Sequence, residues 1–128
     1  MIAANELRIG NYIYWNIPEK LNTFHEVVGI RNGKPQTIPI SLGESILDYL
    51  PISLTPEILE KCGFEWSIYH QAWHKQGFVF DLSERSVGGF FMHKSRLNSE
   101  IICPKIQYLH QLQNLYFALT NEELNYTP

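Results

Sequence analysis

Two histidines in the motif HQAWH have a spacing that can bind a metal ion. His70 and His74 are four residues apart, and on a helix this spacing places two imidazoles on one face, as in zinc proteases. Those enzymes have a glutamate next to the first histidine as the base, whereas this chain has Gln71 there. The segment also has the composition of a turn between strands. We therefore expect surface or hairpin histidines. A metal site completed by His93 or by a cysteine is the alternative.

The two cysteines, Cys62 and Cys103, are the candidates for a nucleophile. A cysteine nucleophile needs a histidine close to it in space. Cys62 falls on the apolar side of a predicted helix, so we expect it to be buried. Cys103 precedes Pro104 at the end of a predicted strand, so it should be more accessible. Two cysteines without a CxxC motif form no disulfide framework, and we expect both to be reduced.

Motifs for other kinds of catalysis are absent from the sequence. The chain has no GxSxG motif, no glycine-rich phosphate loop and no dinucleotide-binding fingerprint. Its carboxylates show no pairing that predicts an acid and base couple. We therefore assign no catalytic, cofactor-binding or metal-binding residue. The sequence favours a protein that is not an enzyme.

Aromatic side chains in the predicted strands are candidates for a binding surface. Because side chains alternate along a strand, some of them face outward unless both sheet faces are covered. The simplest interpretation is a two-sided core, but such aromatics also anchor protein partners or stack on bases beside basic side chains. The aromatics are Trp15, Trp66, Trp73, Tyr12, Tyr14 and Tyr69. The basic residues are Arg8, Arg31, Lys34, Lys75, Arg85, Lys94 and Arg96.

Length and composition indicate one globular domain. The chain has 128 residues, of which 45% are apolar, and a formal net charge of −3. The negative charge disfavours general nucleic-acid binding, because such proteins usually carry a basic surplus. No segment is long and apolar enough to span a bilayer, and the first residues lack a signal-peptide pattern. We therefore expect a cytoplasmic protein, and any linker should lie in residues 41–52.

The first part of the chain has the pattern of small antiparallel strands. Residues 12–15 and 24–30 are rich in aromatic and β-branched side chains, which favour strands. Asn32-Gly33 then predicts a tight hairpin turn into residues 35–40, where prolines favour an edge strand. Three strands of this kind resemble the start of an SH3-like barrel, as an analogy of pattern alone.

A short central helix has its ends marked in the sequence. Thr55 is placed as the N-cap and Pro56 occupies the first helical position. Leu54 can pack on Leu59 at the start of the helix. Gly63 fits the left-handed position that ends a helix. We therefore predict a capped helix within residues 54–64.

The second half of the chain predicts further strands. Apolar and polar residues alternate from Phe64 to Tyr69, a turn follows near residues 70–72, and residues 73–82 read as one strand. Residues 83–86 are predicted as a polar turn. Residues 87–93 are predicted as a strand with a bulge or a close backbone approach at Gly88-Gly89, and residues 100–103 as a final short strand.

The most periodic segment is residues 106–119, which predicts a helix introduced by Pro104 and ended at Asn121. Its predicted apolar side, packed on the sheet, comprises Leu109, Leu112, Leu115, Tyr116 and Leu119. Its predicted polar side comprises His110, Gln111, Gln113 and Asn114. We expect this polar side to face solvent, although an amide-rich face can also pair with a second copy.

Three segments carry a resemblance to other proteins. They read NELRIGNYI at residues 5–13, PISLTPEILEKCGF at residues 51–64 and LHQLQNLYFALTNEEL at residues 109–124. In this order they resemble uncharacterised small proteins of Bacteroides-type genomes, phages and mobile elements. The resemblance implies a protein of the host cytoplasm, of phage or mobile-element type. It implies no activity and transfers no site residue.

Together these patterns predict a single-domain α+β protein. Small antiparallel sheets, a short central helix and a C-terminal helix packed on the sheet account for the chain. The function favoured by the sequence is non-catalytic binding, as an adaptor that contacts a protein partner or a second copy. A nucleic-acid-binding accessory protein is the alternative, followed by a small metal-dependent enzyme.

Overall fold

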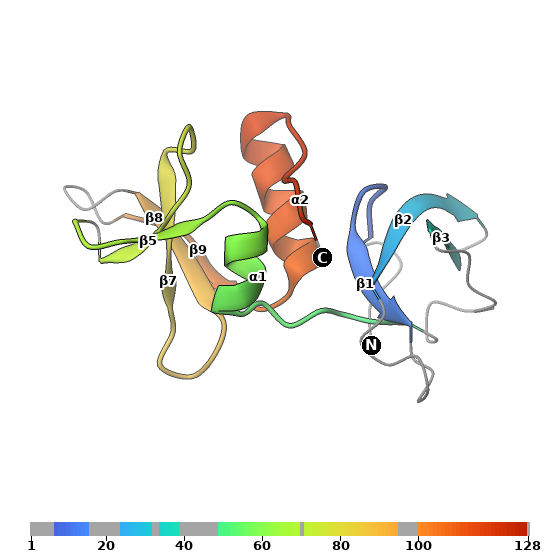
Figure 1. The fold of residues 1–128 in the computed structure, drawn as a ribbon, viewed down its shortest axis with the longest axis horizontal. Coiled ribbons are helices and arrows are strands. Elements are labelled where there is room, and N and C mark those ends of the chain that lie inside the picture. The colour runs from blue at the N-terminus through green and yellow to red at the C-terminus, as the bar shows by residue number, and fades with distance from the viewer. Residues whose placement is uncertain are drawn as a thin grey trace. The chain divides into compact units, whose positions relative to one another are not determined.

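The computed structural model of the chain confirms the predicted α+β class (Figure 1). It describes residues 7–15, 24–31, 34–38, 49–69, 71–94 and 100–127. The chain divides into two compact units. Unit 1 comprises Met1–Ile52 and Tyr108–Glu123, and unit 2 comprises Ser53–Gln107 and Leu124–Pro128. The expectation that one domain spans the chain stays a prediction.

Unit 1 contains an antiparallel sheet in the order β3-β2-β1-β4. Its strands are β1 (Tyr12–Trp15), β2 (Phe24–Arg31), β3 (Lys34–Ile38) and β4 (Tyr49–Leu50). The first three confirm the predicted strands, and Pro35 lies in an edge strand, where its missing N–H is tolerated. The predicted Asn32-Gly33 turn lies outside the described residues. The SH3-like analogy stays a prediction.

Helix α2 (Leu109–Thr120) is the second layer of unit 1, and it begins three residues later than predicted. Its end is as predicted, because Asn121 has a φ of +60° and donates its N–H to the carbonyl of Phe117 at 2.8 Å. Leu109, Leu112 and Tyr116 are buried, as expected.

The predicted division of α2 into an apolar and a polar side is wrong at three positions. His110 and Gln113 are each 1% exposed, although both were placed on the solvent side. Leu119, placed on the buried side, is 40% exposed. Hydrophobicity alone misplaces Gln113 because a polar side chain can be buried where it has hydrogen-bond partners, which Gln113 has in Gly10 and Tyr12.

Unit 2 contains a five-stranded antiparallel sheet in the order β5-β6-β7-β8-β9. Its strands are β5 (Glu65–Ser67), β6 (Ala72–His74), β7 (Phe80–Glu84), β8 (Phe90–Lys94) and β9 (Ile101–Ile106). Each strand pairs with its neighbours in the sequence, and β5 and β9 are the outer strands. The core of the unit includes Leu59, Phe64, Leu82, Met92 and Ile106, each at most 1% exposed.

Helix α1 (Pro56–Lys61) confirms the predicted capped helix of unit 2. The hydroxyl oxygen of Thr55 accepts a hydrogen bond from the N–H of Ile58 at 3.2 Å. Gly63 has a φ of +90°, and its N–H donates to the carbonyl of Glu60 at 3.0 Å. The N–H of Phe64 donates to the carbonyl of Leu59 at 3.0 Å. These two bonds form a Schellman motif, which satisfies the last carbonyls of the helix.

The predicted strand over residues 73–82 is wrong, because a tight turn divides it. The N–H of Phe78 donates to the carbonyl of Lys75 at 3.0 Å, and Gly77 has a φ of +85°. Glycine reaches this conformation without the steric cost that other residues have. The chain therefore reverses between β6 and β7.

The predicted turn at residues 83–86 is displaced. Ser83 and Glu84 belong to β7, and the turn is closed by a bond from the Arg85 N–H to the Gly89 carbonyl at 2.9 Å. Gly88 and Gly89 have φ of +96° and +75°. The glycine pair therefore makes the hairpin turn instead of a bulge within the next strand. The alternative of a close backbone approach is confirmed at Gly89, where a Cβ would lie 3.1 Å from the Ile106 carbonyl oxygen.

The final strand is longer than predicted, and it includes Pro104. Proline removes one N–H donor, which an outer strand such as β9 tolerates on its open side. Pro104 therefore does not introduce helix α2, and Ile106 is a buried strand residue rather than the first residue of the helix.

The burial of Leu112 gives a test of the role of α2. Leu112 is fully buried and Leu119 on the same helix is 40% exposed. We expect Leu112→Asp to lower the free energy of unfolding by more than about 4 kcal/mol, because it buries an unpaired charge. The matched variant Leu119→Asp should lose less than about 1 kcal/mol. Urea unfolding followed by circular dichroism measures both. Equal, small losses would show that α2 is peripheral.

Candidate functional site

The described histidines of unit 2 have hydrogen-bond partners in the sheet. Nδ1 of His74 lies 2.7 Å from a carboxylate oxygen of Asp81, which is fully buried. Nε2 of His93 lies 2.8 Å from the hydroxyl of Ser83, and its Nδ1 lies 2.7 Å from the Lys94 carbonyl. His70 lies outside the described residues. Within the described ranges, no cluster of three or more His, Cys, Asp or Glu side chains has a geometry for metal binding.

The Ser83–His93 pair has the hydrogen bonding of a nucleophile and base. A carbonyl oxygen only accepts, so Nδ1 of His93 donates to Lys94 and, in the neutral ring, Nε2 accepts from the Ser83 hydroxyl. His93 is only 8% exposed, and neither residue lines the two surface hollows described below. We interpret the Ser83 hydroxyl as a hydrogen-bond partner for the buried imidazole of His93, not as a nucleophile.

The two cysteines differ in burial, as predicted. Cys62 ends α1 and is 1% exposed. Burial raises the pKa of the Cys62 thiol to about 12, although the nearby Lys75 ammonium acts in the opposite direction. The thiolate, which is the reactive form, is therefore scarce at neutral pH. Cys103 is half-buried in β9, and both cysteines are free thiols.

The buried Gln113 side chain hydrogen-bonds the backbone at the start of β1. Its Nε2 donates to the Gly10 carbonyl at 3.0 Å. Its Oε1 accepts from the Tyr12 N–H at 3.0 Å. One side chain of α2 therefore satisfies a backbone acceptor and a backbone donor that lie about a hundred residues earlier in the chain.

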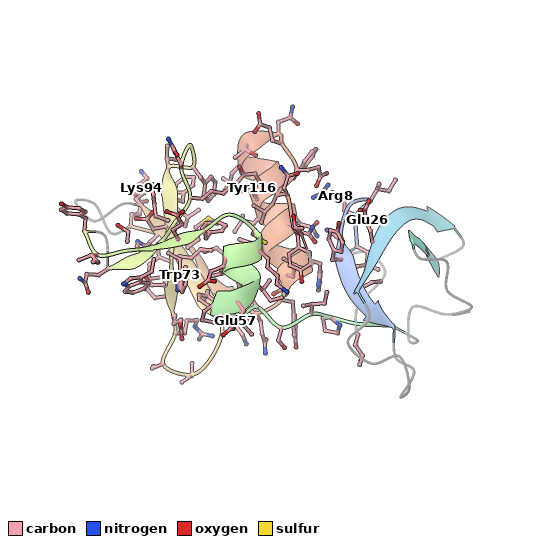
Figure 2. All side chains as sticks on the ribbon, viewed as in Figure 1. Arg8, Glu26, Glu57, Trp73, Lys94 and Tyr116 are labelled. Carbon is pink, nitrogen blue, oxygen red and sulfur yellow. The ribbon has the colours of Figure 1, made fainter. Side chains whose placement is uncertain are left out.

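Arg8 and Asn11 extend this connection to Asn114. Nε of Arg8 and Nδ2 of Asn11 donate to the Asn114 side-chain oxygen, at 3.1 Å and 2.8 Å. The Arg8 guanidinium (Figure 2) also forms an ion pair with Glu123 and lies 4.3 Å from the centre of the Phe117 ring. We call Arg8, Asn11, Gln113, Asn114 and Glu123 the amide network. These contacts give Gln113 and Asn114 a structural role within unit 1.

Only some of the strand aromatics are exposed. Trp66 and Tyr69 have 52% and 81% of their surface exposed, whereas Trp73 has 8%. Tyr12 is half-buried, and its hydroxyl donates to Glu26 at 3.1 Å. Burial, followed by this hydrogen bond and the Glu26 charge, raises the pKa of Tyr12. The side chains of Tyr14 and Trp15 lie outside the described part of the structure.

The basic candidates that the structure describes all form hydrogen bonds or ion pairs within the chain. Arg8 belongs to the amide network, and Nζ of Lys75 donates to the Cys62 carbonyl at 3.2 Å. Arg85 donates to the Gly88 carbonyl at 3.2 Å, and Lys94 pairs with Glu100 at 3.3 Å. The side chains of Arg31 and Lys34, and all of Arg96, lie outside the described residues.

A surface hollow of about 560 Å³ lies beside β5. We call it the His74 hollow, and the residues that line it include Glu65, Trp66, Ile68, Tyr69, His74 and Gln76. Ile68 is 76% exposed, so three of the four residues from Trp66 to Tyr69 are exposed large apolar side chains. Phe64 is 1% exposed, so the alternating apolar residues Phe64, Trp66 and Ile68 do not share one buried face. The reason is that β5 is an outer strand, whose side chains are only partly covered.

A second hollow of about 360 Å³ adjoins the first at Glu65 and Trp66. We call it the Trp73 hollow, and it is lined by Glu60, Phe64, Glu65, Trp66 and Trp73. Trp66 and Trp73 are directly opposite each other in β5 and β6, with ring centres 5.7 Å apart at 70°. This edge-to-face contact holds the exposed indole against the buried one.

The candidate functional site is therefore the outer surface of β5 with its two hollows. Trp66, Trp73, Tyr69 and His74 were candidates from the sequence, and the fold brings them to one end of the sheet of unit 2. Sequence reasoning missed Glu60 and Glu65 as members of the site. The sequence did offer one indication of their proximity. Glu60 precedes and Glu65 follows the predicted helix end at Gly63, and a turn at Gly63 places α1 next to β5.

None of the described helices is long and apolar enough to cross a membrane. Comparisons of the chain with protein-family models, with curated proteins and with solved structures found no match.

The buried Gln113 gives a test of the amide network. We expect Gln113→Leu to lower the free energy of unfolding by about 2–4 kcal/mol, because the Tyr12 N–H and the Gly10 carbonyl lose their partner. The matched variant Gln111→Leu, on the half-buried first turn of the same helix, should lose about 1 kcal/mol. Urea unfolding of the two variants checks the difference. Indistinguishable losses would contradict a structural role for the network.

Proposed function

We propose that this protein is a non-catalytic binding protein of adaptor type, which contacts a protein partner through the surface of β5. The observation that carries the proposal is the exposure of Trp66, Ile68 and Tyr69 beside the His74 hollow. Tryptophan and tyrosine are the side chains that most often dominate the binding energy of protein interfaces. Exposed large apolar side chains that gather at one site favour an interaction surface.

The position of β5 at the edge of the sheet supports a partner in extended conformation. An outer strand has one row of backbone N–H and C=O groups that no neighbouring strand of its own sheet pairs. A partner strand can add to such an edge, and pockets beside it then select the side chains. Both hollows adjoin β5, so they are placed for this selection.

The charges of this surface favour protein over nucleic acid. Glu65 lines both hollows, and Glu60 lines the Trp73 hollow. The phosphate groups of nucleic acid would be repelled by these carboxylates. The basic residues Lys75, Arg85 and Lys94 make contacts within unit 2 instead.

The proposed setting is the bacterial cytoplasm, with an origin in a phage or other mobile element. It is supported by the sequence resemblance of three segments to Bacteroides-type proteins and by two free cysteines. A second copy of the chain is the other candidate for the partner, and light scattering distinguishes this case.

Affinity purification from a Bacteroides-type lysate tests the proposal. We expect a specific protein to be retained by the wild-type chain. The variant Trp66→Ser/Tyr69→Ser should weaken its binding by at least about tenfold, because these side chains provide most of the apolar contact area. The control Val79→Ser/Val87→Ser removes two side chains that are 72% and 79% exposed and line neither hollow.

Thermal unfolding of both variants checks that they remain folded. The proposal is contradicted if the control variant loses the partner as much as the Trp66/Tyr69 variant does. It is also contradicted if both variants retain every lysate protein as strongly as the wild-type chain does.

A further inference from the structure

We infer that β5 pairs with β5 of a second copy of the chain when no other partner occupies this edge of the sheet. The two strands run antiparallel, with Trp66 of one copy opposite Trp66 of the other. The inference rests on the proposed function, because it uses the same edge. It adds a form of regulation, since a protein partner must displace the second copy in order to bind.

The two outer strands of the sheet in unit 2 differ in their protection against strand addition. β9 contains Pro104 and Lys105, and its pairing with β8 is irregular at two places. Proline, lysine and bulges on an outer strand hinder the addition of a further strand. β5 has the sequence Glu65-Trp66-Ser67 and pairs with β6 in a regular register. Of the two edges, β5 is therefore the one that can accept another strand.

The side chains from Phe64 to Ile68 match those of a second copy in antiparallel order. With Trp66 opposite Trp66, Phe64 would lie opposite Ile68, so that apolar side chains meet on one face. Glu65 would lie opposite Ser67, so the carboxylate meets a hydroxyl. Parallel pairing in register would place Glu65 directly opposite Glu65, which is destabilising. The pattern therefore favours a symmetric antiparallel pair.

The Trp73 hollow is placed to receive Ile68 of the second copy. Phe64 and Trp66 line this hollow, and Phe64 is 1% exposed. Ile68 directly follows β5 and is 76% exposed. Because Ile68 of one copy would lie opposite Phe64 of the other, it would cover the hollow that Phe64 lines. Each copy therefore provides one exposed apolar side chain and one hollow, as a two-fold symmetric interface requires.

The surface available for this pairing is small, so the pair should be weak. The exposed parts of Trp66, Ile68 and Tyr69 amount to about 400 Å² on each copy. A standard protein interface buries about 800 Å² on each partner. We therefore expect a dissociation constant of about 0.1–1 mM, which a tighter protein partner can overcome.

Sedimentation equilibrium of the full-length protein tests the pairing. We expect the wild-type chain to be a monomer at about 20 µM and to approach a dimer above about 1 mM. Ile68→Glu should raise the dissociation constant at least about tenfold, because a charge would enter the apolar hollow. The matched control Val87→Glu places the same charge at a position that is 79% exposed and lines neither hollow. It should keep the wild-type dissociation constant.

A disulfide experiment tests the antiparallel register. Glu65→Cys and Ser67→Cys are each combined with Cys103→Ser, and the two proteins are mixed at the highest concentration and oxidised. Directly opposite residues of an antiparallel pair have Cα atoms about 4.5–5.5 Å apart, which suits a disulfide. We expect the mixed disulfide dimer to exceed the sum of the two same-variant dimers at least about threefold. Random collision would give equal amounts.

The inference is overturned if the wild-type chain stays a monomer at the highest concentration. It is also overturned if Ile68→Glu and Val87→Glu weaken self-association equally, or if the mixed disulfide has no advantage. Thermal unfolding checks that every variant is folded.

Failure of this inference is distinguishable from failure of the proposed function. A strictly monomeric chain that retains a lysate protein through Trp66 and Tyr69 would keep the proposed function and reject self-pairing. A chain that dimerises in the antiparallel register but retains no lysate protein would keep self-pairing and reject the separate protein partner.

Discussion

Backbone hydrogen bonding is the constraint on which the structure of each unit depends. In unit 1 the buried Gln113 side chain satisfies one backbone acceptor just before β1, the Gly10 carbonyl, and one backbone donor at its first residue, the Tyr12 N–H. Burying the groups without this partner would cost free energy comparable to lost hydrogen bonds. In unit 2, β5 is an outer strand of the described sheet, so one side of it pairs with no neighbouring strand of that sheet. The same requirement therefore explains the internal contact in unit 1 and the candidate binding edge in unit 2.

Local chemistry made parts of the fold predictable from sequence. Helix α1 has its N-cap at Thr55 and its left-handed end at Gly63, as expected, because capping depends on a few adjacent residues. The strand boundaries in unit 2 were less predictable. A glycine such as Gly77 is compatible with a turn or a strand bulge, and the pairing of β6 with β7 on either side of it decides between them. The strand role of Pro104 likewise depends on its place at an edge, which is a property of the whole sheet.

The candidate site shows where sequence reasoning stops. Trp66 and Trp73 have the same side chain and both lie in strands, yet one is half exposed and the other buried, because β5 is an outer strand and β6 an inner one. The sequence shows no pairing of Glu60 or Glu65 with other carboxylates. Only the fold shows that both residues line the Trp73 hollow, one from α1 and one from β5. Arg8 donates to the Gln113 carbonyl, and Arg8 and Asn11 both donate to the Asn114 side chain, so hydrogen bonds within unit 1 join residues 5–13 to residues 109–124. The proposed binding surface lies mostly outside these two segments.

The proposed function depends on the surface of β5 being the part of the chain that a partner covers. Hydrogen–deuterium exchange of the wild-type protein, with and without the protein that it retains, measures this directly. The account predicts slower exchange of the backbone amides of residues 64–69 in the complex, with exchange in residues 109–120 unchanged. Protection confined to residues 109–120, with residues 64–69 exchanging at the same rate as in the free protein, would contradict it.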